Sequence, residues 1–167
     1  MVFLRAPVSP WCNGPMQVRP ATPADLPALL ALDRGAPTAA HWSESDYQRL
    51  LSEAGRVTLV IEDRYVQGFV VARGLGPEWE IENIAIANSG QRRGLGRRLV
   101  EEVLDRAQTH GAQAVFLEVR ESNRAARGLY SSLGFVESGR RQSYYRNPEE
   151  DAVMYKKIVA AAAPESY

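Results

Sequence analysis

The stretch IAIANSGQRRGLGRRLVEEVLDRAQTHG, residues 84–111, decides the fold, because it leads from a strand through a glycine loop into a helix. The β-branched alternation of residues 84–86 is typical of a strand end. Apolar residues then recur at helical spacing, namely Leu95, Leu99, Val103 and Ala107. Gly111 follows the last of them, so the pattern predicts a helix that ends there.

The glycine loop has the properties of an anion site. Free backbone N–H groups and the positive end of a helix dipole converge where the helix begins. Gly94 and Gly96 let the backbone approach phosphate oxygens without an intervening Cβ. Arginines surround the loop with positive charge: Arg92, Arg93, Arg97 and Arg98. By spacing alone, a glycine-rich helix start with solvated arginines is an equally good interpretation.

Two other phosphate-binding loops are excluded by this sequence. No Gly-Lys-Ser/Thr is present to hold a nucleotide phosphate and magnesium, and Leu99 stands where a dinucleotide-binding loop has its third glycine. No second βαβ unit is available for a dinucleotide fold either.

Upstream of the loop, three β-branched or alternating runs predict an antiparallel meander. These runs are residues 57–63, 66–74 and 78–87. Before them, Thr22 and Pro23 are typical of a helix start, and a helix over about 23–33 is expected. Ser43 repeats the capping pattern and predicts a second, short helix.

Downstream of the loop, the apolar run over 114–119 predicts a buried strand of parallel type, because a helix long enough for a crossover precedes it. Residues 123–133 are typical of another helix that ends at Gly134. Residues 152–158 are expected to form the last strand. The chain shows no internal repeat.

Length and composition favour one domain, over residues 16–158, with a flexible arm at 1–15 and a frayed tail at 159–167. Acidic and basic residues balance at 20 each, which gives no global attraction to nucleic acid or an anionic membrane. A lone cysteine, Cys12, excludes an internal disulfide, and no apolar run is long enough to span a bilayer. Neither His41 nor His110 belongs to a metal or nucleophile constellation. We therefore expect a soluble cytoplasmic protein without a metal.

Two linked motifs resemble the signature of the GNAT acetyltransferase superfamily. They are Gln91-x-x-Gly94-x-Gly96 after a strand, and Asn123-x-x-Ala126-x-x-Leu129-Tyr130-x-x-Leu133-Gly134-Phe135 after the next one. Within that superfamily, residues 117–135 and 140–157 are similar to RimI-like enzymes, which acetylate the N-terminal alanine of a small-subunit ribosomal protein. The chain departs from the family in lacking a proline between strand and loop, and in having His41-Trp42-Ser43 where Pro-Trp-Ser is common.

The resemblance implies a GNAT fold of mixed α/β class. Such a fold has a mostly antiparallel sheet flanked by helices, with a parallel strand pair splayed around the site of acetyl-coenzyme A, the cosubstrate. Backbone groups of Ile84, Ala85 and Ile86 would pair with the pantetheine arm. Asn123 would hydrogen-bond near the thioester. The pyrophosphate would lie on Gln91, Arg92, Arg93, Gly94, Leu95, Gly96 and Arg97.

The resemblance also implies that Glu118 is the general base and that Tyr130 protonates the departing thiolate. Glu118 lies in an apolar run, where a charge without function would be costly. Its alternative role is a rim carboxylate paired with Arg120 or Arg124. Glu80 and Glu82 are substitute bases on the strand before the loop, and the alternative for Tyr130 is a core aromatic.

The acceptor is expected to be the α-amine of a peptide or protein. Its unperturbed pKa of about 7.7–8.0 suits a carboxylate base better than the lysine value of about 10.4. The alternatives are acetylation of a small amine and a coenzyme A binding module without catalysis. Tyr144-Tyr145 would wall the acceptor groove or be ordinary strand aromatics, and the acidic run 149–151 would attract a cationic terminus or form a solvated turn.

Overall fold

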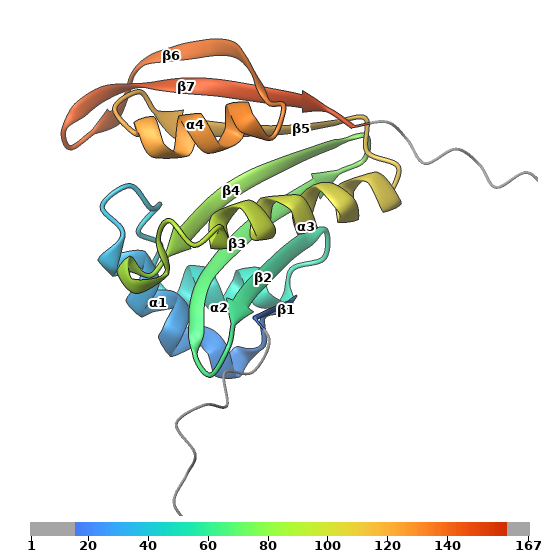
Figure 1. The fold of residues 1–167 in the computed structure, drawn as a ribbon, viewed down its shortest axis with the longest axis vertical. Helices are drawn as coiled ribbons and strands as arrows, with labels where there is room; N and C mark the ends of the chain where they lie inside the picture. Colours follow the sequence, from blue (N-terminus) through green and yellow to red (C-terminus); the bar gives the residue numbers. More distant parts are fainter. Residues whose placement is uncertain (1–15, 160–167) are drawn as a thin grey trace, which may run out of the picture.

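The β-branched and apolar runs of the sequence form the inner strands of a seven-stranded sheet in the order β1-β2-β3-β4-β5-β7-β6 (Figure 1). The computed structural model describes residues 16–159. The predicted arm at 1–15, with Cys12, and all of the expected tail except residue 159 lie outside the described residues. The domain bounds therefore stay a prediction.

The first half of the sheet is the expected antiparallel meander, extended by one short strand. Its strands are β1 (Gln17–Pro20), β2 (Arg56–Glu62), β3 (Val66–Leu75) and β4 (Glu78–Ile86). A 3-10 turn, η1 (Pro23–Asp25), leads into α1 (Leu26–Gly35), and α2 (Glu44–Ser52) follows, capped by Ser43. Both helices pack on one face of the meander, around the fully buried Tyr47 and Phe69.

The opposite face is covered by α3 (Leu95–Thr109), which follows the turn η2 (Asn88–Gly90). Its predicted apolar stripe is buried against the sheet: Leu95, Leu99, Val103 and Ala107. Because α3 carries the chain back to the start of β4, β5 (Ala114–Arg120) enters parallel to β4, as predicted. The helix α4 (Arg124–Ser132) packs beside it, and β6 (Val136–Arg146) and β7 (Glu149–Ile158) complete the sheet.

Two strands were not predicted from the sequence. β1 has only 4 residues, and β6 is an edge strand whose side chains are almost all exposed, so neither shows a buried alternation. The acidic run 149–151 opens β7, where pairing to β6 makes Arg146 the partner of Glu149. The solvated-turn interpretation of that run is therefore wrong.

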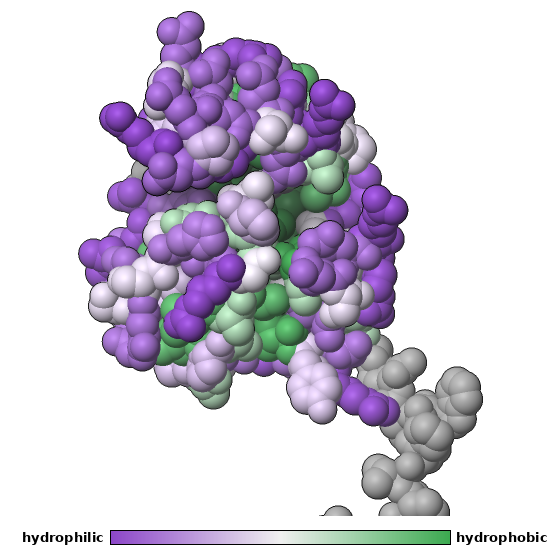
Figure 2. Space-filling view, turned by 90° about the vertical axis from the view of Figure 1, so that its left-hand side faces the viewer, coloured by the Kyte–Doolittle hydropathy of each residue, from purple (hydrophilic) through white to green (hydrophobic). Residues whose placement is uncertain are grey.

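The two halves of the sheet separate at one end. β4 and β5 pair only from Glu78–Ala114 to Ile81–Leu117, and beyond these residues the strands diverge (Figure 1). In the β3–β4 register, Ala72 faces Ile81 and Val71 faces Asn83, so Glu82 is the extra residue of a bulge. Figure 2 shows the molecule hollowed at this open end, with apolar atoms in the hollow.

Candidate active site

The splayed edge of β4 begins immediately after Ile81, its last residue paired with β5. On the other edge of β4, Ile84 pairs with Val70 and Ile86 with Gly68. The residues predicted to bind pantetheine, Ile84 to Ile86, therefore present their second edge to the opening. A backbone edge of this kind fits an extended amide-bearing arm as it would fit another strand.

The glycine loop ends at Gly94, which has φ 77° and precedes the first residue of α3. The first hydrogen bond of the helix runs from the N–H of Arg98 to the carbonyl of Gly94, so the N–H groups of residues 95–97 have no acceptor within the helix. A Cβ built on Gly94 would meet nothing within 4 Å, whereas one on Gly96 would lie 3.4 Å from Leu129 Cδ2. Gly94 thus leaves room for a phosphate, and Gly96 lets α3 approach α4.

The arginines around the loop point in different directions. Arg92 and Arg93 are exposed at the start of α3. Arg97 donates to Ser132 Oγ at 2.7 Å and so connects α3 to α4. Arg98 donates to the carbonyl of Met16 at 2.9 Å, toward β1. The expectation that Arg98 adds charge to the anion site is wrong, because this contact draws its guanidinium away.

Gln91 and Asn123, both expected at the cofactor, also have structural partners. Gln91 Nε2 donates to Asn88 Oδ1 at 3.1 Å, which folds its side chain onto the loop. Asn123 Oδ1 caps α4 by accepting from the N–H of Ala126 at 3.1 Å. Its Nδ2 donates to Thr38 Oγ1 at 3.3 Å, so it joins the α1–α2 loop to α4.

Glu118 is the first residue of β5 beyond its last pairing with β4, so its side chain stands at the point where the sheet opens. Its carboxylate is mostly covered and accepts from Arg141 Nε at 2.9 Å. Arg120, one of the partners considered from the sequence, pairs instead with Glu150 at 3.3 Å and stacks over the Tyr145 ring at 4.1 Å.

The two substitute bases differ in their surroundings. Glu82, the bulge residue, binds Nε and Nη2 of Arg56 at 2.9 Å each. Glu80 lines a cavity of about 190 Å³ together with Glu118 and Arg141. Partial burial, followed by repulsion from Glu82 and Glu118, raises the pKa of Glu80. Of the two, Glu80 is thus the one in a position to exchange a proton in the cavity.

Tyr130 is 4% exposed, and its ring packs against Phe135 and Tyr155 with centroids 5.8 and 6.2 Å apart. Burial, and to a smaller extent the nearby Tyr145, raise the pKa of Tyr130, so its phenol keeps its proton at neutral pH. Within residues 16–159 its hydroxyl makes no hydrogen bond. The residue is therefore a core aromatic whose proton is available to a ligand.

A buried polar network that was not predicted holds the α1–α2 loop against β4. Asn83 Nδ2 donates to Asp33 Oδ1 at 3.0 Å and to the Tyr47 hydroxyl at 3.1 Å, and Asn83 Oδ1 accepts from the N–H of Ala40 at 3.3 Å. Asp33 is 1% exposed. The signal in the sequence was an asparagine that alternates with the buried apolar residues Ile81 and Ala85 of β4. A buried amide requires hydrogen-bond partners.

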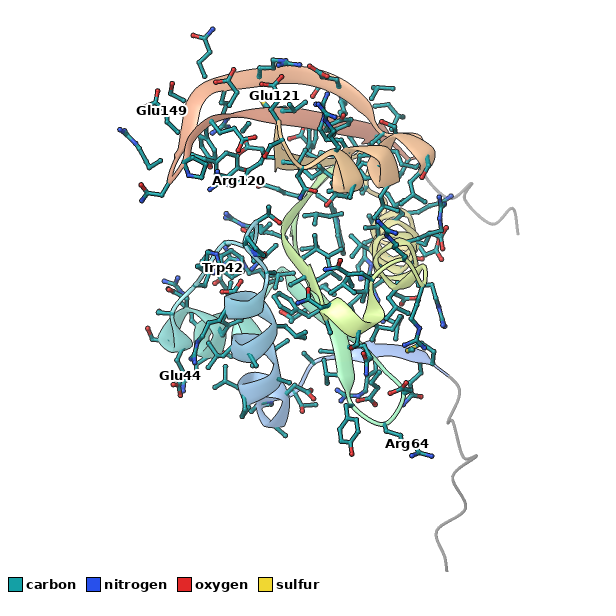
Figure 3. All side chains as sticks on the ribbon, turned by 60° about the vertical axis from the view of Figure 1, so that its left-hand side comes forward. Trp42, Glu44, Arg64, Arg120, Glu121 and Glu149 are labelled. Atoms are coloured by element: carbon teal, nitrogen blue, oxygen red, sulfur yellow. The ribbon has the colours of Figure 1, made fainter. Side chains whose placement is uncertain are left out.

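Aromatic side chains flank the opening on both sides. Trp42 packs edge-on against Tyr47 at 5.7 Å, and Tyr144 against Tyr145 at 5.1 Å. Figure 3 shows Trp42, before α2, and Arg120, at the end of β5, on opposite sides of the opening. The Glu118 charge raises the pKa of Tyr144, and burial and then the same charge raise that of Tyr145. Both tyrosines therefore lie near the candidate base.

Among the described residues, no group of three or more His, Cys, Asp and Glu side chains is arranged to hold a metal ion. None of the helices in residues 16–159 combines the length and the apolar character needed to cross a membrane.

Comparison with known proteins agrees with this geometry. Residues 25–135 match the model of the acetyltransferase (GNAT) family. The chain is 38% identical over 137 residues to the [ribosomal protein bS18]-alanine N-acetyltransferase of Salmonella typhimurium, a match that covers 78% of this chain and 88% of that one. The crystal structure of the ribosomal-protein-S18-alanine N-acetyltransferase from Escherichia coli superposes with a TM-score of 0.79 at 29% identity, over 91% of this chain and 99% of that one. Arabidopsis thaliana NAA60 shares the fold, with a TM-score of 0.80 at 20% identity over 88% of this chain and 99% of that one.

Proposed function

The chain belongs to the GNAT acetyltransferase family and is an acetyl-coenzyme A dependent N-acetyltransferase, and from this premise we propose that its acceptor is the N-terminal α-amine of a protein. The relatives from Salmonella typhimurium and Escherichia coli act on the alanine of ribosomal protein bS18. We propose the same acceptor class for this chain, a small-subunit ribosomal protein with N-terminal alanine, and we place the reaction in the cytoplasm.

The observation that carries the proposal is the position of Glu118 where β4 and β5 separate. We propose that this carboxylate, directly or through water, takes a proton from the acceptor ammonium, because an amine attacks a thioester only when neutral. The nitrogen lone pair then forms a bond to the thioester carbonyl carbon, and the carbon–sulfur bond breaks. Tyr130 gives its proton to the departing sulfur, and the proton that the nitrogen loses on becoming a neutral amide passes through solvent to restore the phenol.

We propose that the cosubstrate binds the residues on the other side of the opening. The free edge of residues 84–86 would pair with the pantetheine arm, and the N–H groups of residues 95–97 would receive the pyrophosphate. Residues 91–93 would form the outer wall of the phosphate site. We propose that Asn123, which already reaches toward Thr38, contacts the arm near the thioester.

Mass spectrometry of acetylated products tests this function. The purified protein is incubated with acetyl-coenzyme A and peptides that differ in their first residue, including one with the N-terminus of ribosomal protein bS18. Peptides with a blocked N-terminus and an internal lysine, and free polyamines, serve as comparison acceptors. We expect acetylation of free α-amines, with alanine preferred; acetylation confined to lysine side chains or to polyamines would contradict the proposal.

The role of Glu118 is tested in the same assay. Glu118→Gln keeps the shape of the side chain and removes its ability to accept the proton. We expect it to lower kcat/KM by about 100- to 10,000-fold, as is usual for loss of a general base. A value within about threefold of the unsubstituted enzyme would assign the proton transfer to another group, and Glu80→Gln would then show the large loss.

A further inference from the structure

Arg141 reaches from the edge strand β6 across β7 to the candidate base on β5. Its Nε lies 2.9 Å from Glu118 Oε1, and both residues line the 190 Å³ cavity that also contains Glu80. The Arg141 side chain is 52% exposed, whereas that of Glu118 is 17% exposed. The guanidinium thus contacts the carboxylate from the solvent side, the side from which an acceptor amine must approach.

Neighbouring arginines are held by contacts outside the cavity. Arg140, next in the chain, pairs with Glu121 and with Glu137, the latter at 2.9 Å. Arg120 pairs with Glu150. Arg141 differs from both because its carboxylate partner is the residue to which catalysis is assigned.

The backbone around Arg141 allows its side chain to move away from Glu118. The β6–β7 register is irregular between Arg141 and Tyr145, and Ser143 within this segment has φ 49°. The guanidinium carbon of Arg141 already lies 5.4 Å from the centre of the Tyr144 ring. An arginine that moves off Glu118 therefore keeps an aromatic face to rest on and reaches solvent without breaking a strand pair.

We propose that Arg141 occupies the position of the acceptor amine in the free enzyme. Its guanidinium binds Glu118 there, and the ammonium of the acceptor displaces it. This inference rests on the proposed function and deepens it by naming a residue that determines acceptor specificity. Both cations are hydrogen-bond donors drawn to the same carboxylate, and their like charges repel each other there, so they compete for it. Displacing Arg141 from Glu118 costs free energy. A peptide offsets this cost through its other contacts with the enzyme, whereas a small free amine makes fewer such contacts.

The first test separates KM from kcat. Arg141→Gln removes the competing charge at similar length, and Arg140→Gln is the matched control one residue away. At saturating acetyl-coenzyme A, we expect Arg141→Gln to lower the KM for the acceptor peptide by about two- to fivefold, the effect of one weak, partly exposed ion pair. We expect kcat to change by less than about twofold, and Arg141→Lys to restore the original KM. An unchanged or raised KM in Arg141→Gln would overturn the inference.

A binding cycle provides a second measurement that does not depend on turnover. The Kd of the acceptor peptide is measured by calorimetry, in the presence of coenzyme A, for the unsubstituted enzyme, Arg141→Gln, Glu118→Gln and the double variant. We expect Arg141→Gln to tighten binding only where Glu118 is present. Equal tightening in both backgrounds would refute competition for Glu118.

Failure of this inference is distinguishable from failure of the proposed function. If the unsubstituted enzyme acetylates no free N-terminus, the proposed acceptor is wrong. If it does so and Arg141→Gln leaves the KM for the peptide unchanged, only the role of Arg141 is wrong.

Discussion

Arg56 holds Glu82 through two nitrogens, Nε and Nη2, each 2.9 Å from a carboxylate oxygen. The pair joins β2 to the bulge of β4. Both side chains are only 14% exposed, so the pair is mostly shielded from solvent. Glu80, two residues earlier on the same strand, instead lines the cavity with Glu118. The same residue type thus has a structural role at one position and lines the cavity at the other.

Glu82→Gln is expected to reduce stability rather than turnover. Glu82→Gln leaves the mostly covered Arg56 paired with Glu53, whose side chain is 37% exposed, and we expect the free energy of unfolding to fall by about 1–3 kcal/mol. Urea denaturation measures this change. The kcat/KM of the variant should stay within about threefold of the original value; a loss comparable to that of Glu118→Gln would make Glu82 a catalytic group.

Glu80→Gln is expected to stabilise the protein at neutral pH. A carboxyl whose pKa is raised on folding contributes stability that is present below its unfolded pKa and is lost as pH rises, so ionised Glu80 opposes folding at pH 7. The variant should therefore unfold at a higher temperature than the original protein at pH 7. The difference should disappear below the ordinary glutamate pKa of about 4.3. Identical melting temperatures at both pH values would contradict this.

Tyr130→Phe is expected to slow the reaction and leave the fold intact. The ring contacts with Phe135 and Tyr155 do not require the hydroxyl, so the melting temperature should stay within a few degrees. Loss of the acid should lower kcat by about ten- to several-hundred-fold. An unchanged kcat at saturating substrates would leave Tyr130 as a core aromatic only.

Replacing Arg92 and Arg93 together by alanine is expected to weaken acetyl-coenzyme A binding by about five- to fiftyfold, since charge-assisted contacts to phosphate are lost. Calorimetry with coenzyme A measures this, and pantetheine, which has no pyrophosphate, should bind both proteins alike. Arg98→Ala is the matched control, because its guanidinium is engaged by the Met16 carbonyl. An equal loss in Arg98→Ala would point to a general charge effect.

Asp25 should make stability depend on pH in the acid range. Arg19 donates hydrogen bonds to both carboxylate oxygens of Asp25, at 2.8 and 2.9 Å. These bonds lower the pKa of Asp25 from 3.8 to about 2. A depressed carboxyl pKa gives stability that is present above the unfolded value and is lost as pH falls from about 4 to 2. Asp25→Asn should lose about 2 kcal/mol at pH 7 and little at pH 2, with the exposed Asp105→Asn as control.

The glycine loop and the motif around Asn123 and Tyr130 were predictable because their information is local. Strand, glycine turn and helix follow one another within residues 84–111, and each rests on backbone propensity and periodicity. The parallel pairing of β5 with β4 also followed, because a crossover helix restricts the topology. The roles assigned to individual residues of this loop and motif stay predictions.

Tertiary structure alone decided which polar and charged groups of the candidate site meet. Arg141 contacts Glu118, and Asp33 contacts Asn83, across many intervening residues, and no periodicity encodes such pairs. The edge strand β6 was missed for a related reason: its exposed side chains carry no buried pattern, and its place is set by hydrogen bonds to β7. Local sequence determines elements through the backbone, whereas the surroundings of a side chain depend on residues that only folding brings together.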